Sequence, residues 1–161
     1  MITALLTTSA IVLNGLLAGL LFAFVCAVSP AYRRLSDEEF VHGFRAINQA
    51  ILRPSFLTVF LGAPVTALAA AVVGTVSGTA LDGTAMVLLW VGAGGSLGSL
   101  LITMAVNVPL NTRLDRATIE SNADCSAARV GFEATWNRWN LIRCVSSIVA
   151  VLGFALALAL G

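Results

Sequence analysis

The chain has 161 residues, of which 58% are hydrophobic and only 11% are charged, and its formal net charge is +1. Soluble domains carry about 25% charged residues, so a surface this apolar must face lipid. The near-neutral charge gives no support for nucleic acid as a partner. Three scattered cysteines without a CxxC motif indicate neither a metal site nor a disulfide framework.

Charged residues are absent from four long stretches, 1–32, 54–81, 83–112 and 144–161. A transmembrane helix needs about 20 apolar residues, and barrel strands would be about ten residues long with alternating polarity. We therefore predict an all-α, polytopic membrane four-helix bundle that forms a single domain over residues 1–161. Its spans are expected near 4–28, 55–75, 84–107 and 140–160.

Arginine is concentrated in two of the three connections between these spans. The first and third connections hold Arg33, Arg34, Arg45, Arg53, Arg113, Arg116, Arg129 and Arg138, whereas the second holds only Asp82. The positive-inside rule then places both arginine-rich connections in the cytoplasm and both termini outside. Basic residues that are all arginine, together with many alanines, indicate a bacterial source and hence the cytoplasmic membrane.

The first connection contains a helix start of its own. Ser36 and Glu39 have the spacing of a capping box, in which each side chain bonds the other residue's backbone N–H. The helix should continue to about Leu52, with an apolar face and a polar face at helical spacing. It is expected either to lie on the membrane surface or to extend the second span.

Small residues recur every four positions in the first span, at Gly15, Gly19, Ala23 and Ala27. Such a stripe lets another helix backbone approach closely. The stripe is explained by packing inside the bundle, and it also indicates a possible homo-oligomer.

The end of the third span carries two amides around a proline. Asn107 and Asn111 flank Pro109, which removes a backbone donor and should kink or end the helix there. The amides are then either helix caps or part of a polar niche beside freed backbone groups.

Four residues at the start of the last span share one helix face, because they are spaced i, i+3, i+4 and i+7. They are Trp136, Trp139, Asn140 and Arg143. One interpretation is an interfacial aromatic belt with a snorkelling arginine. The other is a pocket wall in which indole rings flank a flat ligand and Asn140 and Arg143 bind its oxygens.

His42 is the only histidine, and it lies with Asn48 on the capped helix. A lone histidine is most often a surface or capping residue, although it can act as a general base near neutral pH. One histidine without a cysteine cluster makes a dinuclear metal centre improbable, and no metal site is predicted.

These motifs together resemble a family of small four-helix membrane proteins described as anthrone-oxygenase-like. The resemblance rests on the Asn107–Asn111 segment and the Trp136–Arg143 stripe, and it extends to Ser29-Pro30 and to residues 46–48 before Pro54. It covers nearly the whole chain and implies the fold more strongly than the reaction. The family name implies oxidation of anthrones to anthraquinones.

What the resemblance implies is a cofactor-independent reaction on a flat, lipophilic, anthrone- or quinone-like substrate. The site would need a base, donors for an enolate oxygen and an apolar slot. His42, Asn140 and Arg143 are the candidate catalytic residues. The candidate substrate-binding residues are Asn48, Asn107, Asn111, Trp136 and Trp139.

Two alternatives stay open, a binding or transport module for a small hydrophobic molecule and a non-catalytic accessory membrane subunit. The orientation puts the end of the third span and the start of the fourth at the same membrane face. We therefore expect the Asn107–Asn111 and Trp139–Arg143 motifs to meet in one cytoplasmic-side pocket, with His42 or Asn48 near its mouth. The expected partners are the lipid bilayer and a small lipophilic ligand.

Overall fold

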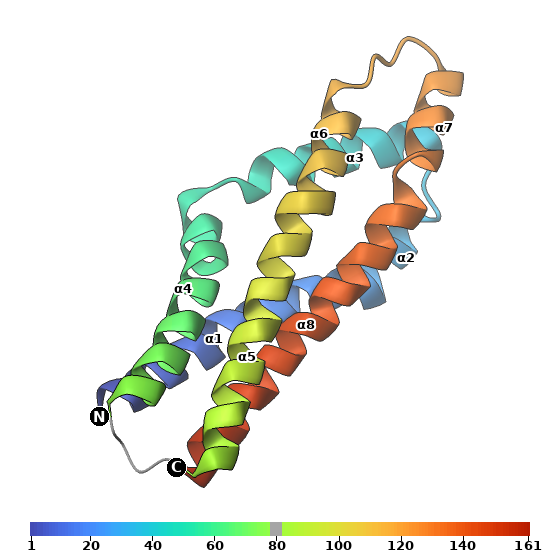
Figure 1. Ribbon diagram of the computed structural model, residues 1–161. Coiled ribbons are helices and arrows are strands. Elements are labelled where there is room, and N and C mark those ends of the chain that lie inside the picture. Colours follow the sequence, from blue (N-terminus) through green and yellow to red (C-terminus); the bar gives the residue numbers. More distant parts are fainter. Residues whose placement is uncertain (78–81) are drawn as a thin grey trace.

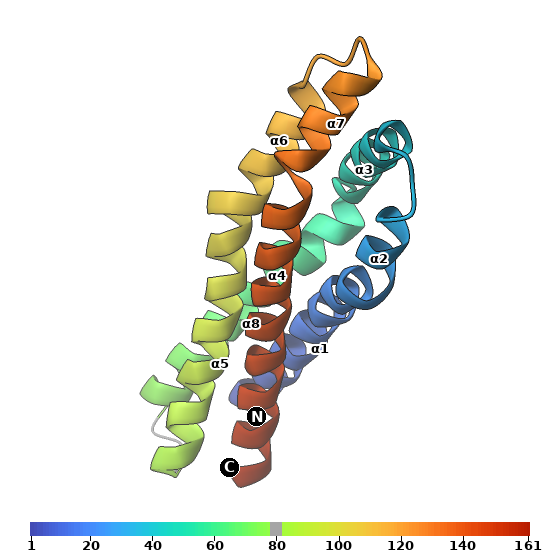
Figure 2. The same cartoon turned by 90° about the vertical axis from the view of Figure 1, so that its right-hand side faces the viewer.

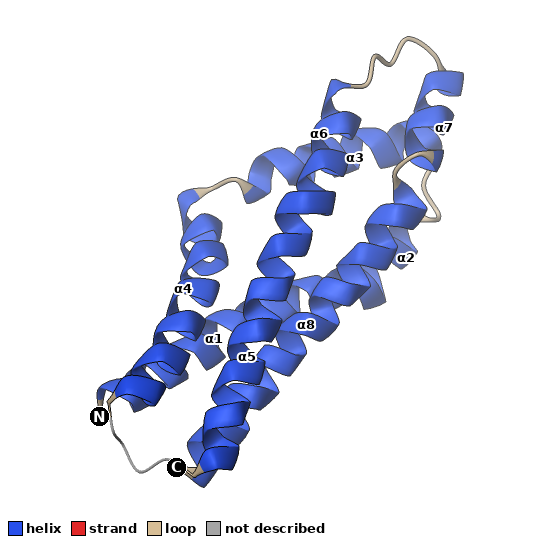
Figure 3. Cartoon of the chain, in the orientation of Figure 1, coloured by secondary structure: helices blue, strands red, loops and turns tan. Residues whose placement is uncertain are grey.

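The computed structural model describes residues 1–77 and 82–161, and within them all regular structure is helical (Figure 3). In chain order the elements are α1 (Ile2–Ala23), η1 (Phe24–Val28), α2 (Ser29–Tyr32), α3 (Asp37–Ile51), α4 (Pro54–Val76), α5 (Gly83–Ile102), η2 (Thr103–Asn107), α6 (Val108–Arg116), α7 (Asn122–Val130) and α8 (Glu133–Leu160). The two η elements are single π-helical turns. The predicted fold class, an all-α membrane four-helix bundle, is confirmed.

Four helical columns form the bundle. Both α1 and α5 pack against α4 and α8, so the four helices surround a common axis. Both chain termini lie at one end of the bundle, and α3, α6 and α7 lie at the other end (Figure 1). The arginine-rich connections therefore share the end that carries these shorter helices.

The composition of the inside and the outside of the bundle is typical of a membrane protein. The core between the columns is built from small residues, such as Ala10, Ala67 and Ala150, whereas many leucines and valines point outward. Four helical segments are long and apolar enough to cross a membrane. The chain is therefore an integral membrane protein, because its outward apolar side chains need lipid as a solvent.

The predicted capping box is present at the start of α3. The Glu39 N–H donates to Ser36 Oγ at 3.3 Å, and the Ser36 N–H donates to Glu39 Oε2 at 2.9 Å. Hydrogen bonds from Ser36 hold the pKa of Glu39 below its usual value. The helix lies across the end of the bundle in Figure 1 and is seen nearly end-on in Figure 2. The Arg45 guanidinium donates to the carbonyls of Leu114 and Ala117. Arg45 thereby fastens α3 to the last turn of α6.

The chain consists of two similar halves. The π turns begin at residues 24 and 103 and the second long helix of each half begins at 54 and 133, so each pair is 79 residues apart. Several identities keep this spacing, among them Gly15/Gly94, Gly19/Gly98, Pro30/Pro109, Leu35/Leu114 and Gly74/Gly153. The halves run in the same direction, as expected of a parallel repeat related by an axis along the membrane normal.

Each π turn precedes a proline in the same way. In η1 the Ser29 N–H bonds to the carbonyl of Phe24, and in η2 the Val108 N–H bonds to the carbonyl of Thr103. These five-residue bonds let the helix pass through a residue that has no N–H to donate. Of the two outcomes expected at Pro109, a kink or a helix end, the helix end does not occur, because α6 continues the helix to Arg116.

The closest helix contacts use glycines other than those of the first-span stripe. A Cβ on Gly95 would lie 2.6 Å from the Ser146 carbonyl oxygen, and one on Gly153 would lie 2.9 Å from the backbone of α5. A Cβ on Gly15 or Gly19 would meet nothing within 4 Å. Gly15 and Gly19 therefore make no close helix contact within the part of the chain that the structure describes.

Candidate functional site

A largely apolar cavity of about 400 Å³ lies at the arginine-rich end of the bundle. The roof is α3, one wall is the start of α4, and the other wall is the column formed by α5, η2 and α6. The innermost part is lined by α1 and α8. The polar side chains on the cavity are Asn48, Ser99, Thr103, Asn107, Asn111, Thr112, Asp115, Trp136, Asn140 and Arg143.

Arg143 is the central charge of this cavity. Only 8% of the residue is exposed, and no carboxylate of the described residues pairs with it, since the ion pairs found there all belong to Arg129. Its Nη1 donates to Thr103 Oγ1 at 3.2 Å, and its Nη2 donates to Asn140 Oδ1 at 3.0 Å. A buried guanidinium held only by neutral groups keeps a strong electrostatic preference for an anionic or strongly polarised oxygen.

Asn140 positions the guanidinium. The side chain is 1% exposed, and its Nδ2 donates to the backbone carbonyl of Leu21 in α1 at 3.2 Å. That bond fixes which amide atom faces Arg143, since the oxygen is left to accept from the arginine. Asn140 therefore links α1, α8 and the cavity in one chain of hydrogen bonds.

Several polar atoms at the cavity have no partner. Both amide atoms of Asn107, the Nδ2 atom of Asn48 and the Nε atom of Arg143 are buried and make no hydrogen bond. Asn107 is only 1% exposed. Unsatisfied buried polar groups are rare because each costs about 1–3 kcal/mol, so this concentration around one cavity indicates groups that a ligand completes.

Trp136 forms an aromatic wall with α1 and α3. Its ring centroid lies 5.4 Å from that of Phe24 and 4.9 Å from that of Phe44, and its Nε1 donates to Asn111 Oδ1 at 2.9 Å. The Arg143 guanidinium carbon lies 5.6 Å from the centre of the same ring. The indole is thereby fixed between apolar rings and a cation, so it forms a rigid, flat part of the cavity wall.

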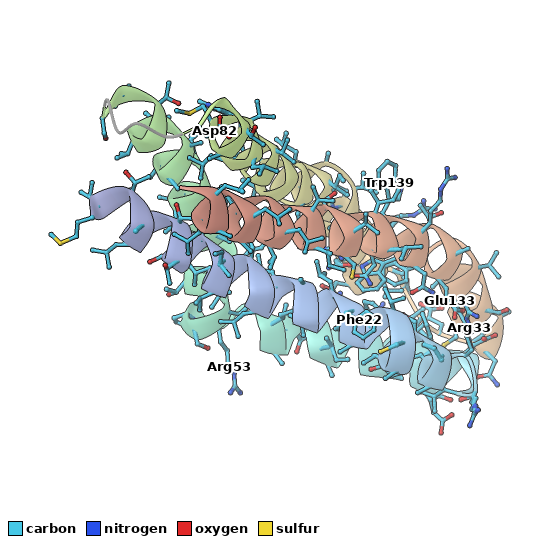
Figure 4. All side chains as sticks on the ribbon, turned by 90° about the horizontal axis from the view of Figure 1, so that it is seen from below. Phe22, Arg33, Arg53, Asp82, Glu133 and Trp139 are labelled. Carbon is cyan, nitrogen blue, oxygen red and sulfur yellow. The ribbon has the colours of Figure 1, made fainter. Side chains whose placement is uncertain are left out.

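The structure brings six of the predicted site residues to this cavity: Asn48, Asn107, Asn111, Trp136, Asn140 and Arg143. Trp139 is half-buried and does not line it; Figure 4 shows this ring on the outer side of α8. His42 is exposed and does not line it either. Neither residue is placed to touch a ligand in this cavity.

Four polar lining residues were not predicted from the sequence: Ser99, Thr103, Thr112 and Asp115. Ser99 and Thr103 lie on the same face as Asn107, at four-residue spacing, which is a signal that could have extended the predicted stripe inward. Asp115 lies one further turn beyond Asn111 and is the only carboxylate on the cavity within residues 1–77 and 82–161. It is exposed at the rim.

The sequence model of the anthrone oxygenase family matches residues 56–153 of the chain. The chain belongs to the anthrone oxygenase family. No curated protein and no solved structure matches it. The matched segment includes Asn107, Asn111, Trp136, Asn140 and Arg143, so most of the polar lining of the cavity lies within it.

Proposed function

We propose that the chain is a membrane-embedded oxygenase that acts on a flat, lipophilic, anthrone- or quinone-like aromatic without a cofactor of its own. The observation that carries the proposal is Arg143, a buried arginine without a carboxylate partner among the described residues, at an apolar cavity. Membership of the anthrone oxygenase family supports the reaction class. The proposed location is a bacterial cytoplasmic membrane, with both termini outside.

The shape and lining of the cavity suit a fused-ring substrate. Its volume of about 400 Å³ falls within the range of small-molecule sites, about 300–1,000 Å³. Phe24, Phe44 and Trp136 provide aromatic surfaces against which a planar molecule can pack. A lipophilic substrate would be concentrated in the bilayer, which is the solvent of the outward face of the bundle.

Arg143 supplies the electrostatic contribution in this mechanism. An anthrone has a methylene group activated by two aromatic rings and a carbonyl, and loss of one proton converts it into an enolate. The guanidinium would bind the enolate oxygen, helped by the unpaired amide of Asn107. Donors fixed in advance in an apolar site stabilise a developing negative charge more than water does.

The enolate supplies the electrons for the oxidation. Electron transfer from the enolate carbon to O2 and formation of a carbon–oxygen bond give a peroxide, which loses water to leave a new carbonyl. Overall the methylene carbon and one O2 become a carbonyl and one H2O. The substrate is oxidised and O2 is reduced, so the balance needs no further electron donor.

The proton lost by the substrate must leave the cavity, and His42 does not line the cavity. Asp115 lies at the rim, eight residues beyond Asn107 and therefore roughly 12 Å away along the helix. We assign Asp115 as the group that receives the proton through water, because it is the only carboxylate that lines the cavity among the described residues.

The test is oxygen consumption by the purified protein in nanodiscs with anthrone as the substrate. Wild-type protein should consume O2 and form anthraquinone, Arg143→Ala should not, and Arg53→Ala should behave as wild type because Arg53 projects away from the helices (Figure 4). Binding of anthrone without O2 consumption would instead support a binding or transport module. Absence of both would support an accessory subunit.

A further inference from the structure

We propose that the chain has a second ligand site, a cleft between η1–α2 and α7–α8 that binds the headgroup of an anionic phospholipid. This cleft has a volume of about 870 Å³ and is open to the surface. It is separate from the chemistry proposed above. The two sites meet only at Asn140, which lines both.

The position of the cleft follows from the two halves of the chain. Val25, Ser29 and Val130 line the cleft, and the residues related to them by the 79-residue spacing, Met104, Val108 and Ile51, line the cavity. The two sites are therefore related by the internal repeat. The repeat supplies a ligand-sized recess on each side of the bundle, and different side chains have given the recesses different properties.

The cleft differs from the cavity in its charges. Arg129 is satisfied, because its guanidinium bonds Asp37 at 3.0 Å and Glu133 at 2.7 Å. Arg33, which follows α2, and Arg138 in α8 line the same cleft, are exposed and make no ion pair with the described residues. A phosphate bound in the cleft would accept from both guanidiniums, because arginine binds phosphate oxygens in a bidentate manner.

The surroundings of the cleft select a lipid rather than a free anion. Val25, Ala134 and Leu141 give it an apolar lining, and the surface continues through Phe22 and Val145, which are 55% and 52% exposed. Charged groups border the cleft at the end of the bundle where the apolar spans stop (Figure 4). A phosphate held between Arg33 and Arg138 would leave its acyl chains along this lipid-facing surface, the arrangement expected of basic pockets between transmembrane helices.

The experiment measures retention of phosphatidylglycerol by native mass spectrometry after reconstitution in phosphatidylcholine bilayers with and without that lipid. The double variant Arg33→Gln/Arg138→Gln should bind phosphatidylglycerol roughly thirtyfold more weakly, given the contribution of each basic residue at an anionic surface. The matched control is Arg53→Gln/Arg116→Gln, which removes the same charge from two other exposed arginines and should retain the lipid.

Three results would overturn the proposal. The first is equal loss of lipid by both double variants, which would mean diffuse attraction to the positive end. The second is no loss by either. The third is displacement of the lipid from wild-type protein by excess inorganic phosphate, which would mean a site for free anions. Retention restored by Arg33→Lys/Arg138→Lys would support the site and exclude misfolding as the cause of the loss.

Discussion

At the scale of single residues, Arg143 is expected to lower the stability of the fold. A buried charge without a partner is destabilising, and polar groups inside a membrane protein mark functional positions by default. We expect Arg143→Met to leave the thermal midpoint in detergent unchanged or higher, because the thioether chain fills similar space without a charge. The same variant should lose anthrone binding.

The opposite outcome would assign Arg143 to the fold. If the guanidinium only fastens α8 to Thr103 and Asn140, Arg143→Met should lower stability by a few kcal/mol, the usual scale for breaking a buried charged network. Unchanged stability together with unchanged binding would mean that neither role is correct.

Asn107 allows a second test at the residue scale. Both atoms of its amide are buried without a partner, so replacing Asn107 with leucine should not weaken the fold. It should weaken ligand binding up to about tenfold, the usual value of one hydrogen bond. Isothermal titration with anthrone, in the absence of oxygen, measures the change.

The matched control for Asn107→Leu is Asn14→Leu. Asn14 is also fully buried and also has an unpaired atom, but it lines neither the cavity nor the cleft, and its Nδ2 bonds the Ala10 carbonyl. Binding should stay at the wild-type level in this variant. Equal loss of binding in both variants would contradict a ligand contact at Asn107.

The sequence was sufficient to predict most of the polar cavity, because helical spacing and depth in the bilayer depend on residue order alone. It was not sufficient to choose between Trp136 and Trp139, which differ by less than a quarter turn of helix. Packing against Phe24 and Phe44, which come from other elements, decides that Trp136 faces inward. His42 was proposed only because it was the single histidine, and the rotation of α3 leaves it in solvent.

At the scale of elements, the spans follow from hydropathy, and the capped start of α3 follows from Ser36 and Glu39. The π turns cannot be predicted in this way, because a proline in a helix ordinarily indicates a break. Whether the helix instead continues through the proline depends on support from neighbouring helices, which come from other parts of the chain. In α6 that support includes the Arg45 hydrogen bonds to the carbonyls of Leu114 and Ala117.

The close contact between α5 and α8 predicts that the stability of the protein depends strongly on having no side chain at Gly95. Gly95→Ala would place a Cβ 2.6 Å from the Ser146 carbonyl oxygen, so one backbone must move. We expect a loss of about 1–3 kcal/mol of stability, as for other overpacked sites. Thermal unfolding in detergent measures the loss.

Gly94→Ala is the control at the neighbouring position. A Cβ there meets nothing within 4 Å, so the substitution should be neutral or slightly stabilising, since alanine favours the helix. If Gly94→Ala destabilised the protein as much as Gly95→Ala, the packing of α5 on α8 described above would be incorrect.

At the scale of the whole molecule, orientation in the membrane stays a prediction from the arginine distribution. A cysteine replacing Thr118, between α6 and α7, should resist a membrane-impermeant thiol reagent added outside the cell. A cysteine at position 80, which lies outside the described residues, should react. The native cysteines should first be replaced by alanine, because Cys26 is exposed. The reverse labelling pattern would refute the orientation.

Self-association also stays a prediction, and the geometry of α1 gives it a surface. Gly15 and Gly19 have open space where a Cβ would be, so a second helix could approach there. Gly19→Leu should shift the mass in mild detergent from an oligomer to a monomer, as measured by light scattering. A monomeric wild type, with no change in the variant, would count against the idea.

The internal repeat is hard to recognise from the sequence alone, because few residues are identical between the two halves. It became evident once both π turns and both later helices kept the same spacing. The repeat also relates the cavity to the cleft, because equivalent positions of the two halves line them. The residue equivalent to Arg143 in the first half, 79 positions earlier, is Pro64, whose side chain carries no charge.

The proposed role of Arg143 is to bind the ionised form of a flat aromatic substrate in the cavity. It can be tested by the absorption spectrum of anthrone, added without oxygen to wild-type protein and to Arg143→Met over a range of pH. Bound anthrone should be an enolate at pH values where free anthrone is neutral, and the variant should abolish this shift. A neutral spectrum on wild-type protein, or the same enolate spectrum on both proteins, would contradict it.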